Sequence, residues 1–354
     1  MRLADFDYAL PEELIAQEPI RDRDQSRLLI VDRERGGIEH RRFFDIIDYL
    51  ADDDLLVLND TRVSAVRLFG LKATGGKVEA LLMKRLPSGD WVGMVKPGRR
   101  VPVGTRLIFG EGLEAEVIER TEEGGRLLRF SADGDPDLLI AQRGEVPLPP
   151  YIHARIDDPS FDKLRIDKLR IDKLRMRERY QTVYAASDGS SAAPTAGLHF
   201  TPALLKKIQA RGIQLAYVTL HVGIATFRPV RTPNVEDHEM HTEYVEIGPK
   251  TAEVINTARR RIVSVGTTTA RVLESAAVGK RRVAPFAGET RLFIRPPYEF
   301  QIVDGLITNF HMPKSTLLML VSAYAGVELV RRAYQEAVRE QYRFLSFGDA
   351  MFLY

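Results

Sequence analysis

The stretch GSSAAPTAGLHFT (residues 189–201) contains runs of small residues, one proline and one imidazole, and the segment PALLKKIQA follows it. Pro202 suits the first turn of a helix, and Thr201 is a typical N-cap. Small side chains let the backbone approach a ligand and direct N–H groups toward it. The stretch therefore predicts a strand-loop-helix junction that presents Thr195 and His199. The alternative is an ordinary turn with a packed histidine.

The same order of apolar strand, polar loop and helix recurs in three later segments: QLAYVTLHVG (214–223), RRIVSVGTTTARVLES (260–275) and FQIVDGLITNFHMPKSTLLML (300–320). Strands that are apolar throughout are typical of parallel sheets covered by helices on both faces. An earlier segment, LLVLNDTR (55–62), also ends an apolar run in polar residues. These units predict an α/β domain, because strands and covering helices alternate along the chain.

Polar residues after such strands are candidates for a ligand site, since the carboxyl ends of parallel strands lie at one edge of the sheet. The run GTTT suits a carboxylate or ribose hydroxyls at a helix N-terminus, and PKST offers a charge and N-caps in a similar place. The quartet NDTR is also compatible with a structural turn. The candidate ligand contacts are Asn59, Asp60, Arg62, Thr195, Gly266, Thr267, Thr268, Asn309 and Lys314, with Asp349 from the C-terminal tail.

The texture of the sequence changes within residues 66–129. Short alternating segments are separated there by TGG, PSGD, KPGRR, VPVG, FGEG and EEGG. Turn signals at intervals of roughly 8 to 12 residues predict an antiparallel β domain, either a small barrel or a sandwich. GEGLEA (110–115) matches a dinucleotide-binding fingerprint, but no helix follows, so we interpret it as a hairpin turn. The predicted organisation is a discontinuous α/β domain (1–62 and 150–354) with an inserted antiparallel β domain (63–149).

A five-residue repeat, RIDKL, follows the proline-rich PLPPYIH. A period of five fits neither a helix nor a strand, so Leu164, Leu169 and Leu174 cannot form one apolar stripe. Between Asp162 and Arg179, eight Lys or Arg residues stand against four Asp or Glu. We interpret the segment as solvated, partly helical or mobile. Contact with an RNA backbone is the alternative.

The composition excludes several kinds of chemistry. Without any cysteine, the chain has no disulfide, thiolate nucleophile, cysteine-ligated zinc or cysteine-ligated iron-sulfur cluster. The net charge is only +2, so any nucleic-acid contact must come from local basic clusters. The sequence shows neither a signal-type apolar core nor an apolar run of membrane length, and we expect a cytoplasmic protein.

Two histidines spaced by three, His238 and His241 in VEDHEMHTEY, could share a zinc or iron ion if they lay on a helix. Pro229 and Pro233 precede them and an alternating TEYVEI follows, so we expect no helix there. We expect no metal and interpret the segment as a polar loop that faces the substrate. A metal-dependent hydrolase that uses these two side chains is one alternative function.

Taken in order, GSSAAPTAGLHFT, TLHVGIATFRPV, EDHEMHTEY, VGTTTARVLES, VDGLITNFHMPKSTLLML and YRFLSFGDAM resemble the S-adenosylmethionine:tRNA ribosyltransferase-isomerase family of queuosine biosynthesis. NDTRV, LPPYIH and RYQTVYA belong to the same pattern, which covers most of the chain. The resemblance implies a barrel-like α/β domain with an inserted β domain. It also implies transfer and isomerisation of the ribosyl part of S-adenosylmethionine onto 7-aminomethyl-7-deazaguanine at the wobble position of tRNA. Epoxyqueuosine forms, and adenine and methionine are released.

The reaction implied by the resemblance needs a base, hydrogen-bond partners and cations for anionic groups. The sulfonium acidifies the adjacent 5′-methylene, so an imidazole or a carboxylate suffices as the base, and no metal or other cofactor is expected. The candidates for proton transfer are the loop histidines His199, His221 and His311. The amide of Asn309 and the hydroxyls of Thr267 and Thr268 are candidates to bind ribose or a carboxylate. Arg228 and Lys314 are candidate cations for methionine or tRNA phosphate. His238 and His241 are further substrate contacts, and Glu239 and Asp349 are alternative bases.

The sequence departs from the family pattern in four places. Ile224-Ala225 replaces a Leu-Gly pair, Pro297 replaces a glycine, Ser191 occupies an apolar or alanine position, and the RIDKL repeat lengthens the segment before RYQTVYA. These changes affect loop geometry and leave the polar residues in place. A non-catalytic RNA-binding module is the second alternative function. We expect a monomer or weak homodimer whose partners are tRNA and S-adenosylmethionine.

Overall fold

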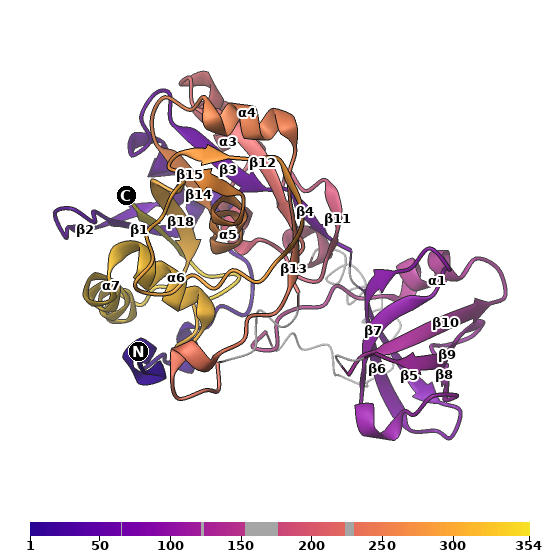
Figure 1. Cartoon of the computed structure of the whole chain (residues 1–354). Coiled ribbons are helices and arrows are strands. Elements are labelled where there is room, and N and C mark those ends of the chain that lie inside the picture. Colours follow the sequence, from indigo (N-terminus) through magenta and orange to yellow (C-terminus); the bar gives the residue numbers. More distant parts are fainter. Residues whose placement is uncertain (65, 122–123, 153–175, 224–229) are drawn as a thin grey trace.

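The computed structural model describes residues 1–64, 66–121, 124–152, 176–223 and 230–354. Its larger part is built on a nine-stranded sheet, and a closed six-stranded barrel lies beside it (Figure 1). This arrangement confirms the predicted mixed α/β class with an antiparallel β-barrel. In the described part of the chain, no helix is both long and apolar enough to cross a membrane.

The large sheet has a parallel centre with antiparallel edges. From edge to edge its strands are β17 (Phe286–Thr290), β13 (Glu243–Ile247), β12 (Gln214–Leu220), β3 (Leu55–Asn59), β14 (Ile262–Val265), β18 (Gly305–Asn309), β19 (Ala350–Leu353), β1 (Arg27–Val31) and β2 (Ile38–Arg42). β12, β3, β14 and β18 are mutually parallel, and β19 is antiparallel to β18 and parallel to β1. The carboxyl ends of four strands therefore meet at one edge.

Both faces of the sheet are covered, as continuously apolar strands predict. Leu55 and Val57 share a core with helices α4 (Pro249–Asn256), α5 (Thr267–Ser275), α6 (Thr316–Ala325) and α7 (Val327–Arg339). Leu56 and Leu58 belong to a second core with α3 (Pro202–Ala210) and the 3-10 helix η4 (Phe43–Asp48). Successive residues of one strand thus feed two cores, which explains why no polar residue interrupts it.

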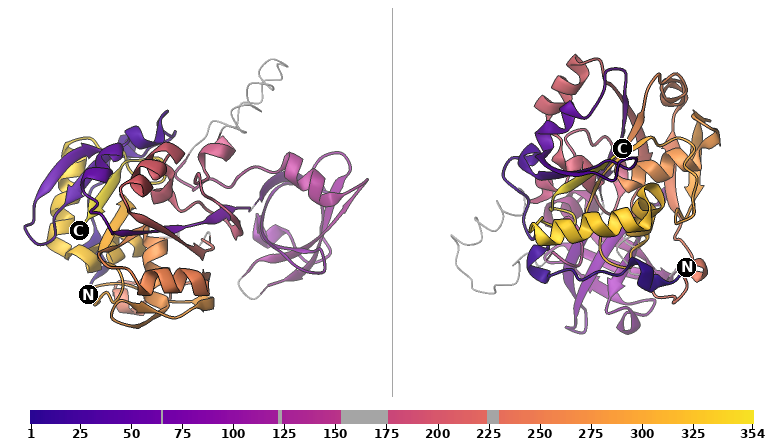
Figure 2. Two further views of the ribbon diagram at one scale, coloured as in Figure 1. Left: turned by 90° about the horizontal axis from the view of Figure 1, so that it is seen from above. Right: turned by 90° about the vertical axis from the view of Figure 1, so that its left-hand side faces the viewer.

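The barrel is closed by antiparallel pairs throughout. Its strands, in order around the barrel, are β10 (Arg126–Ala132), β7 (Trp91–Lys96), β6 (Lys77–Arg85), β5 (Val66–Lys72), β8 (Arg106–Ile108) and β9 (Leu113–Arg120). Gly110 and Gly112 lie in the turn between β8 and β9, as interpreted from the sequence. The barrel has its own apolar core, to which helix α1 (Pro136–Arg143) contributes Ile140. Figure 2 shows the barrel set apart from the large sheet.

The chain enters and leaves the barrel through neighbouring backbone. β4 (Thr61–Val63) leads to it and pairs in parallel with β11 (Ser187–Ser190). At the barrel itself, Arg67 and Glu145 exchange two backbone N–H···O=C bonds of 2.8 Å each. The barrel strands and α1 fall within the segment 63–149 that the sequence predicts as an insertion.

The two ends of the chain complete the fold. The C-terminal tail supplies β19 inside the sheet, where Met351 and Phe352 face opposite cores. The N-terminal segment forms short 3-10 helices interrupted at Pro11 and Pro19. The remaining elements are η1 (Leu3–Phe6), η2 (Glu12–Leu14), η3 (Arg23–Gln25), η5 (Gly98–Arg100), η6 (Thr195–His199), η8 (Val235–Asp237), β15 (Ala277–Gly279) and β16 (Arg282–Val283). The RIDKL repeat, Ile224-Ala225 and Arg228 lie outside the described residues.

Candidate active site

A cavity of about 140 Å³ lies at the carboxyl ends of β14 and β18. Its walls combine hydroxyl, amide and imidazole groups with small apolar side chains. They come from the 193–196 loop, the first turn of α5, and the chain between the end of β18 and the start of α6. Among the residues predicted from the sequence, those that line it are Thr195, Gly266, Thr267, Thr268, Asn309 and His311.

Helix α5 directs its N-terminus at this cavity. Gly266 precedes the helix with φ 93° and ψ 151°, a conformation that is essentially restricted to glycine. Having no side chain, Gly266 provides no acceptor for the first-turn N–H groups. By contrast, α6 nearby is capped by Ser315, whose Oγ accepts from Leu318 N at 3.2 Å. The N-terminus of α5 therefore offers N–H donors and the positive end of a helix dipole to an anion or a hydroxyl oxygen.

Asn309, which lines the same cavity, has an unused acceptor. Its Nδ2 donates to the Leu345 carbonyl at 3.0 Å and to Nε2 of His199 at 3.2 Å. Because that carbonyl can only accept, the amide orientation is fixed. Oδ1 is buried and has no hydrogen-bond partner in the described part of the chain. A buried acceptor left in this way costs about 1 to 3 kcal/mol, which a ligand N–H or O–H donor would recover.

His199 stands behind Asn309 and lines neither this cavity nor the one described below. Its Nε2 accepts from Asn309, so the neutral ring carries its proton on Nδ1, which donates to Oγ of Ser26 at 2.7 Å. The ring stacks on Phe43, with the centroids 4.9 Å apart. Burial, with a smaller contribution from Arg23, lowers the pKa of His199 to about 3. Sequence reasoning could place this imidazole in the loop but could not show that both ring nitrogens are engaged.

His311 reaches the cavity itself. Its Nε2 and Oγ1 of Thr308 form a hydrogen bond of 2.8 Å. Two tyrosines hold its backbone, since Tyr334 accepts from the His311 N–H and Tyr8 donates to the His311 carbonyl. Burial lowers the pKa of His311 to about 3, which keeps the ring neutral at physiological pH. Of the three candidate histidines, His311 alone lines the cavity.

The NDTR quartet at the end of β3 supports the site from the side of β12. Asn59 accepts from Leu220 N at 3.1 Å and donates to Oγ1 of Thr268 at 3.3 Å, which connects β3 to the first turn of α5. Asp60 accepts from Oγ1 of Thr219 at 2.7 Å. Neither Asn59 nor Asp60 lines the cavity. Their side chains hold strand ends together.

His221 lies on the same side, after β12. Thr61 Oγ1 and His221 Nδ1 form a hydrogen bond of 2.8 Å, and the imidazole stacks on Tyr244 with the ring centroids 5.5 Å apart. Partial burial lowers its pKa, and Asp60 opposes that shift. The ring does not line either cavity, although a Cβ at Gly189 would come within 2.7 Å of it.

Three other predicted contacts lie away from the cavity. Lys314 forms an ion pair with Asp7 at 2.7 Å near the surface. Arg62 is exposed. Asp349 is buried and accepts from the backbone N–H groups of Arg27 and Arg343, both at 2.8 Å, and burial raises its pKa. Asp349 therefore anchors the C-terminal turn.

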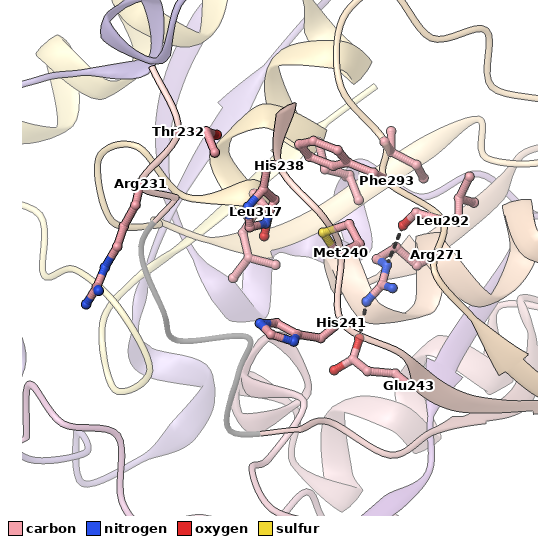
Figure 3. Close-up of a pocket in the computed structure, with 13 residues that line it drawn as sticks. Arg231, Thr232, His238, Met240, His241, Glu243, Arg271, Leu292, Phe293 and Leu317 are labelled. Atoms are coloured by element: carbon pink, nitrogen blue, oxygen red, sulfur yellow. Dashed lines mark hydrogen bonds and ion pairs between the residues drawn. The ribbon is translucent and has the colours of Figure 1, made fainter. Parts of the chain in front are cut away.

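A second cavity, of about 560 Å³, adjoins the first, since Leu317 in α6 lines both. Figure 3 shows Arg271 of α5 between Leu292 and Glu243. Arg271 is 5% exposed, forms a buried ion pair with Glu243 of β13, and donates from Nε to the Leu292 carbonyl at 3.1 Å. Its Nη2 is buried without a hydrogen-bond partner among the residues described.

His238 and His241 also line this second cavity. They follow η8 in a segment that is neither helix nor strand, as the flanking sequence predicts. His238 meets the edge of the Phe293 ring, and burial, followed by the nearby His241, lowers its pKa. The segment thus faces a cavity. In the described ranges, no group of three or more His, Asp or Glu side chains is placed to hold a metal ion.

Arg271 and Glu243 are site residues that sequence reasoning missed. The signal was present in TTTARVLES, where Arg271 stands one helical turn after Thr267 and so lies on the same side of α5. Its partner is 28 residues away on β13. Only the fold brings the two charges together, because nothing in the local sequence indicates burial.

The fold and these cavities define an α/β protein with a small-molecule site at the carboxyl ends of parallel strands, accompanied by a separate β-barrel. The family model described as queuosine biosynthesis protein matches residues 3–353. The chain belongs to this family.

Several similar proteins carry the same name. Two named S-adenosylmethionine:tRNA ribosyltransferase-isomerase, from Carboxydothermus hydrogenoformans and Staphylococcus haemolyticus, are 53% identical over 357 residues and 50% identical over 358 residues, with 100% of both chains covered in each case. The crystal structure of S-adenosylmethionine tRNA ribosyltransferase from Thermotoga maritima is 39% identical, with 99% of this chain and 100% of that chain covered and a TM-score of 0.54. These comparisons confirm the family resemblance found in the sequence.

Proposed function

We propose that this protein transfers and isomerises the ribosyl moiety of S-adenosylmethionine onto 7-aminomethyl-7-deazaguanine at the wobble position of tRNA. The products are epoxyqueuosine in tRNA, adenine and methionine. Full-length similarity to proteins of that name supports the proposal. The structural observation that carries it is the cavity lined by the first turn of α5 and by Asn309, because ribose hydroxyls suit both the N–H groups of that turn and the Asn309 Oδ1, which has no partner among the described residues.

The reaction can begin without a metal. A base removes a proton from the 5′-methylene that the sulfonium acidifies, the ribose ring opens and adenine leaves with the glycosidic electron pair. The tRNA amine then adds to the vinyl sulfonium formed by ring opening and loses a proton, while adenine takes up a proton. The carbon next to sulfur attacks the ring-opened aldehyde, and the resulting alkoxide displaces methionine to close the epoxide. The protein has to bind the ribose, accept one proton and exclude water.

His311 is the best-placed proton acceptor among the candidate histidines. It lines the cavity and is neutral, so it can take a proton at physiological pH. A pKa of about 3 makes it a weak base, which suits only a carbon already acidified by a neighbouring positive charge. We assign His199 to positioning, since it holds Asn309 from outside the cavity. The predicted roles of His221 and Arg228 remain hypotheses to be tested by substitution.

The test is to supply S-adenosylmethionine and tRNA that bears the deazaguanine precursor, and to measure free adenine and modified nucleoside. Turnover that persists after chelation and dialysis is expected, and zinc or iron whose removal abolishes turnover would favour the hydrolase with His238 and His241. A catalytically silent RNA-binding module would bind tRNA without stabilisation by S-adenosylmethionine. The proposed enzyme should gain roughly 2.7 kcal/mol in unfolding free energy at 100 times the dissociation constant of that ligand. We further propose that it acts in the cytoplasm as a monomer or weak homodimer.

A further inference from the structure

We propose that the second cavity is the subsite for an α-amino carboxylate, held by Arg271, and that it receives the methionine end of S-adenosylmethionine. The inference rests on the proposed function and deepens it. It assigns a place to the part of the co-substrate that takes no part in ribose chemistry.

Two polar atoms point to a ligand in this cavity. Nη2 of Arg271 and Oγ1 of Thr232 are both buried and both lack a hydrogen-bond partner among the described residues. Arg271 is 5% exposed, and both residues line the cavity. An unpaired guanidinium N–H inside a protein is costly, and a carboxylate oxygen is the acceptor that best matches it.

The charges favour a zwitterion over a phosphate. Arg271 is already paired with Glu243, so the ion pair presents a cation and an anion side by side. An α-amino acid carries the complementary pair of charges on one carbon atom. A tRNA phosphate brings only negative charge, which Glu243 would repel.

The walls fit the rest of a methionine side chain. Met240, Leu292 and Phe293 line the cavity around Arg271, and Figure 3 shows Met240 beside the guanidinium. Apolar and sulfur-bearing groups pack well against a thioether or sulfonium chain. Leu317 lines this cavity and the cavity of Asn309, so the methionine end and the ribose of one ligand would occupy neighbouring sites.

The experiment compares calorimetric binding of S-adenosylmethionine and decarboxylated S-adenosylmethionine to the full-length protein and to Arg271→Lys. The lysine keeps the charge beside Glu243 and removes the extra N–H donors. The native protein should prefer the carboxylate-bearing ligand by about 10- to 100-fold, the range expected for a hydrogen bond to a charged group. R271K should reduce that preference to below about 3-fold while binding the decarboxylated ligand as before. Thr232→Val should also reduce it, although less.

Arg261→Lys is the matched control, because Arg261 forms an ion pair with Asp54 and lines neither cavity. It should leave the preference unchanged. L-methionine, titrated alone, should bind the native protein and lose affinity in R271K, and this readout holds even if no ribosyl transfer is found. An undiminished preference in R271K would overturn the inference and leave the proposed function standing. Loss of tRNA affinity with unchanged S-adenosylmethionine binding would overturn it in favour of a phosphate.

Discussion

At the scale of the residue, the role of Asn309 can be tested most directly. Asn309→Ala removes the unpaired Oδ1 and leaves a ligand donor without its acceptor, so affinity for S-adenosylmethionine should fall by about 1 to 3 kcal/mol in calorimetry. Asn256→Ala is the control, since the Asn256 side chain bonds to the backbone of Val283 and lines neither cavity. If both variants bind the ligand equally well, Oδ1 does not contact it.

The two buried histidines should separate in kinetics. His311→Gln removes the proposed proton acceptor in the cavity and should lower single-turnover adenine release by ~10²- to 10⁴-fold with little change in S-adenosylmethionine binding. His199→Gln should cost less, because a glutamine oxygen can still accept from Nδ2 of Asn309. Rapid-quench assays at saturating ligand measure the chemical step directly. Equal losses in both variants would mean that His199 does more than hold Asn309.

The sequence predicted which residues lie near the cavity, but it did not predict which of their polar atoms are buried and already paired. Polar residue types after apolar strands indicated Thr195, Gly266, Thr267, Thr268, Asn309 and His311, and the fold brings them to one cavity. The same reasoning also selected Asp349, whose carboxylate instead accepts hydrogen bonds from two backbone N–H groups. Sequence periodicity shows which strand a residue follows, but not whether its polar atoms are already paired.

At the scale of the element, the start of α5 depends on one glycine. Gly266→Ala forces a side chain onto φ 93° and should lower the unfolding free energy by about 1 to 3 kcal/mol, and S-adenosylmethionine should bind less tightly because the first turn shifts. Gly248→Ala is a matched control at the N-cap of α4, where φ is −70° and no atom lies within 4 Å of the added Cβ. Urea unfolding and calorimetry of both variants test this, and an unaffected Gly266→Ala would show that the junction adapts without strain.

The positions of the strands in the sequence were easier to predict than the pairing between strands. Predominantly apolar runs identified β3, β14 and β18, because strands buried on both faces are rich in apolar residues. Short alternating segments separated by turn residues likewise identified the antiparallel β domain from local sequence alone. Placement of β19 between β18 and β1 was not foreseen, since strand pairing joins residues far apart in sequence and leaves no local pattern.

At the scale of the whole molecule, buried neutral imidazoles make stability depend on acid. The pKa values of His199 and His311 are about 3 in the folded protein against 6.5 for an ordinary imidazole, so the unfolded chain binds more protons between those limits. Stability is then fully present above pH 6.5 and falls as the pH drops toward 3, by about 1.4 kcal/mol per pH unit for each histidine. Glu274 and Asp349, whose pKa values are raised by burial, act in the opposite sense.

The difference between the native protein and a variant isolates the histidine contribution. Between pH 6 and pH 4, His199→Gln should reduce the slope of unfolding free energy against pH by about 1.4 kcal/mol per pH unit, which corresponds to one proton. Lys207→Gln replaces an exposed side chain and removes no imidazole, so it should follow the native curve. Denaturant titrations at several pH values give both slopes, and parallel curves for all three proteins would contradict a buried neutral His199.

The backbone bonds between Arg67 and Glu145 leave the two crossings of the chain one strand spacing apart, about 5.5 Å for a hydrogen-bonded antiparallel pair. A turn of two residues closes such a gap. The barrel can therefore be deleted, inserted or exchanged for another domain at this one point of the chain, and the order of the nine strands in the sheet stays the same. The part of the chain that forms the large sheet and the barrel can accordingly follow separate evolutionary histories within one polypeptide.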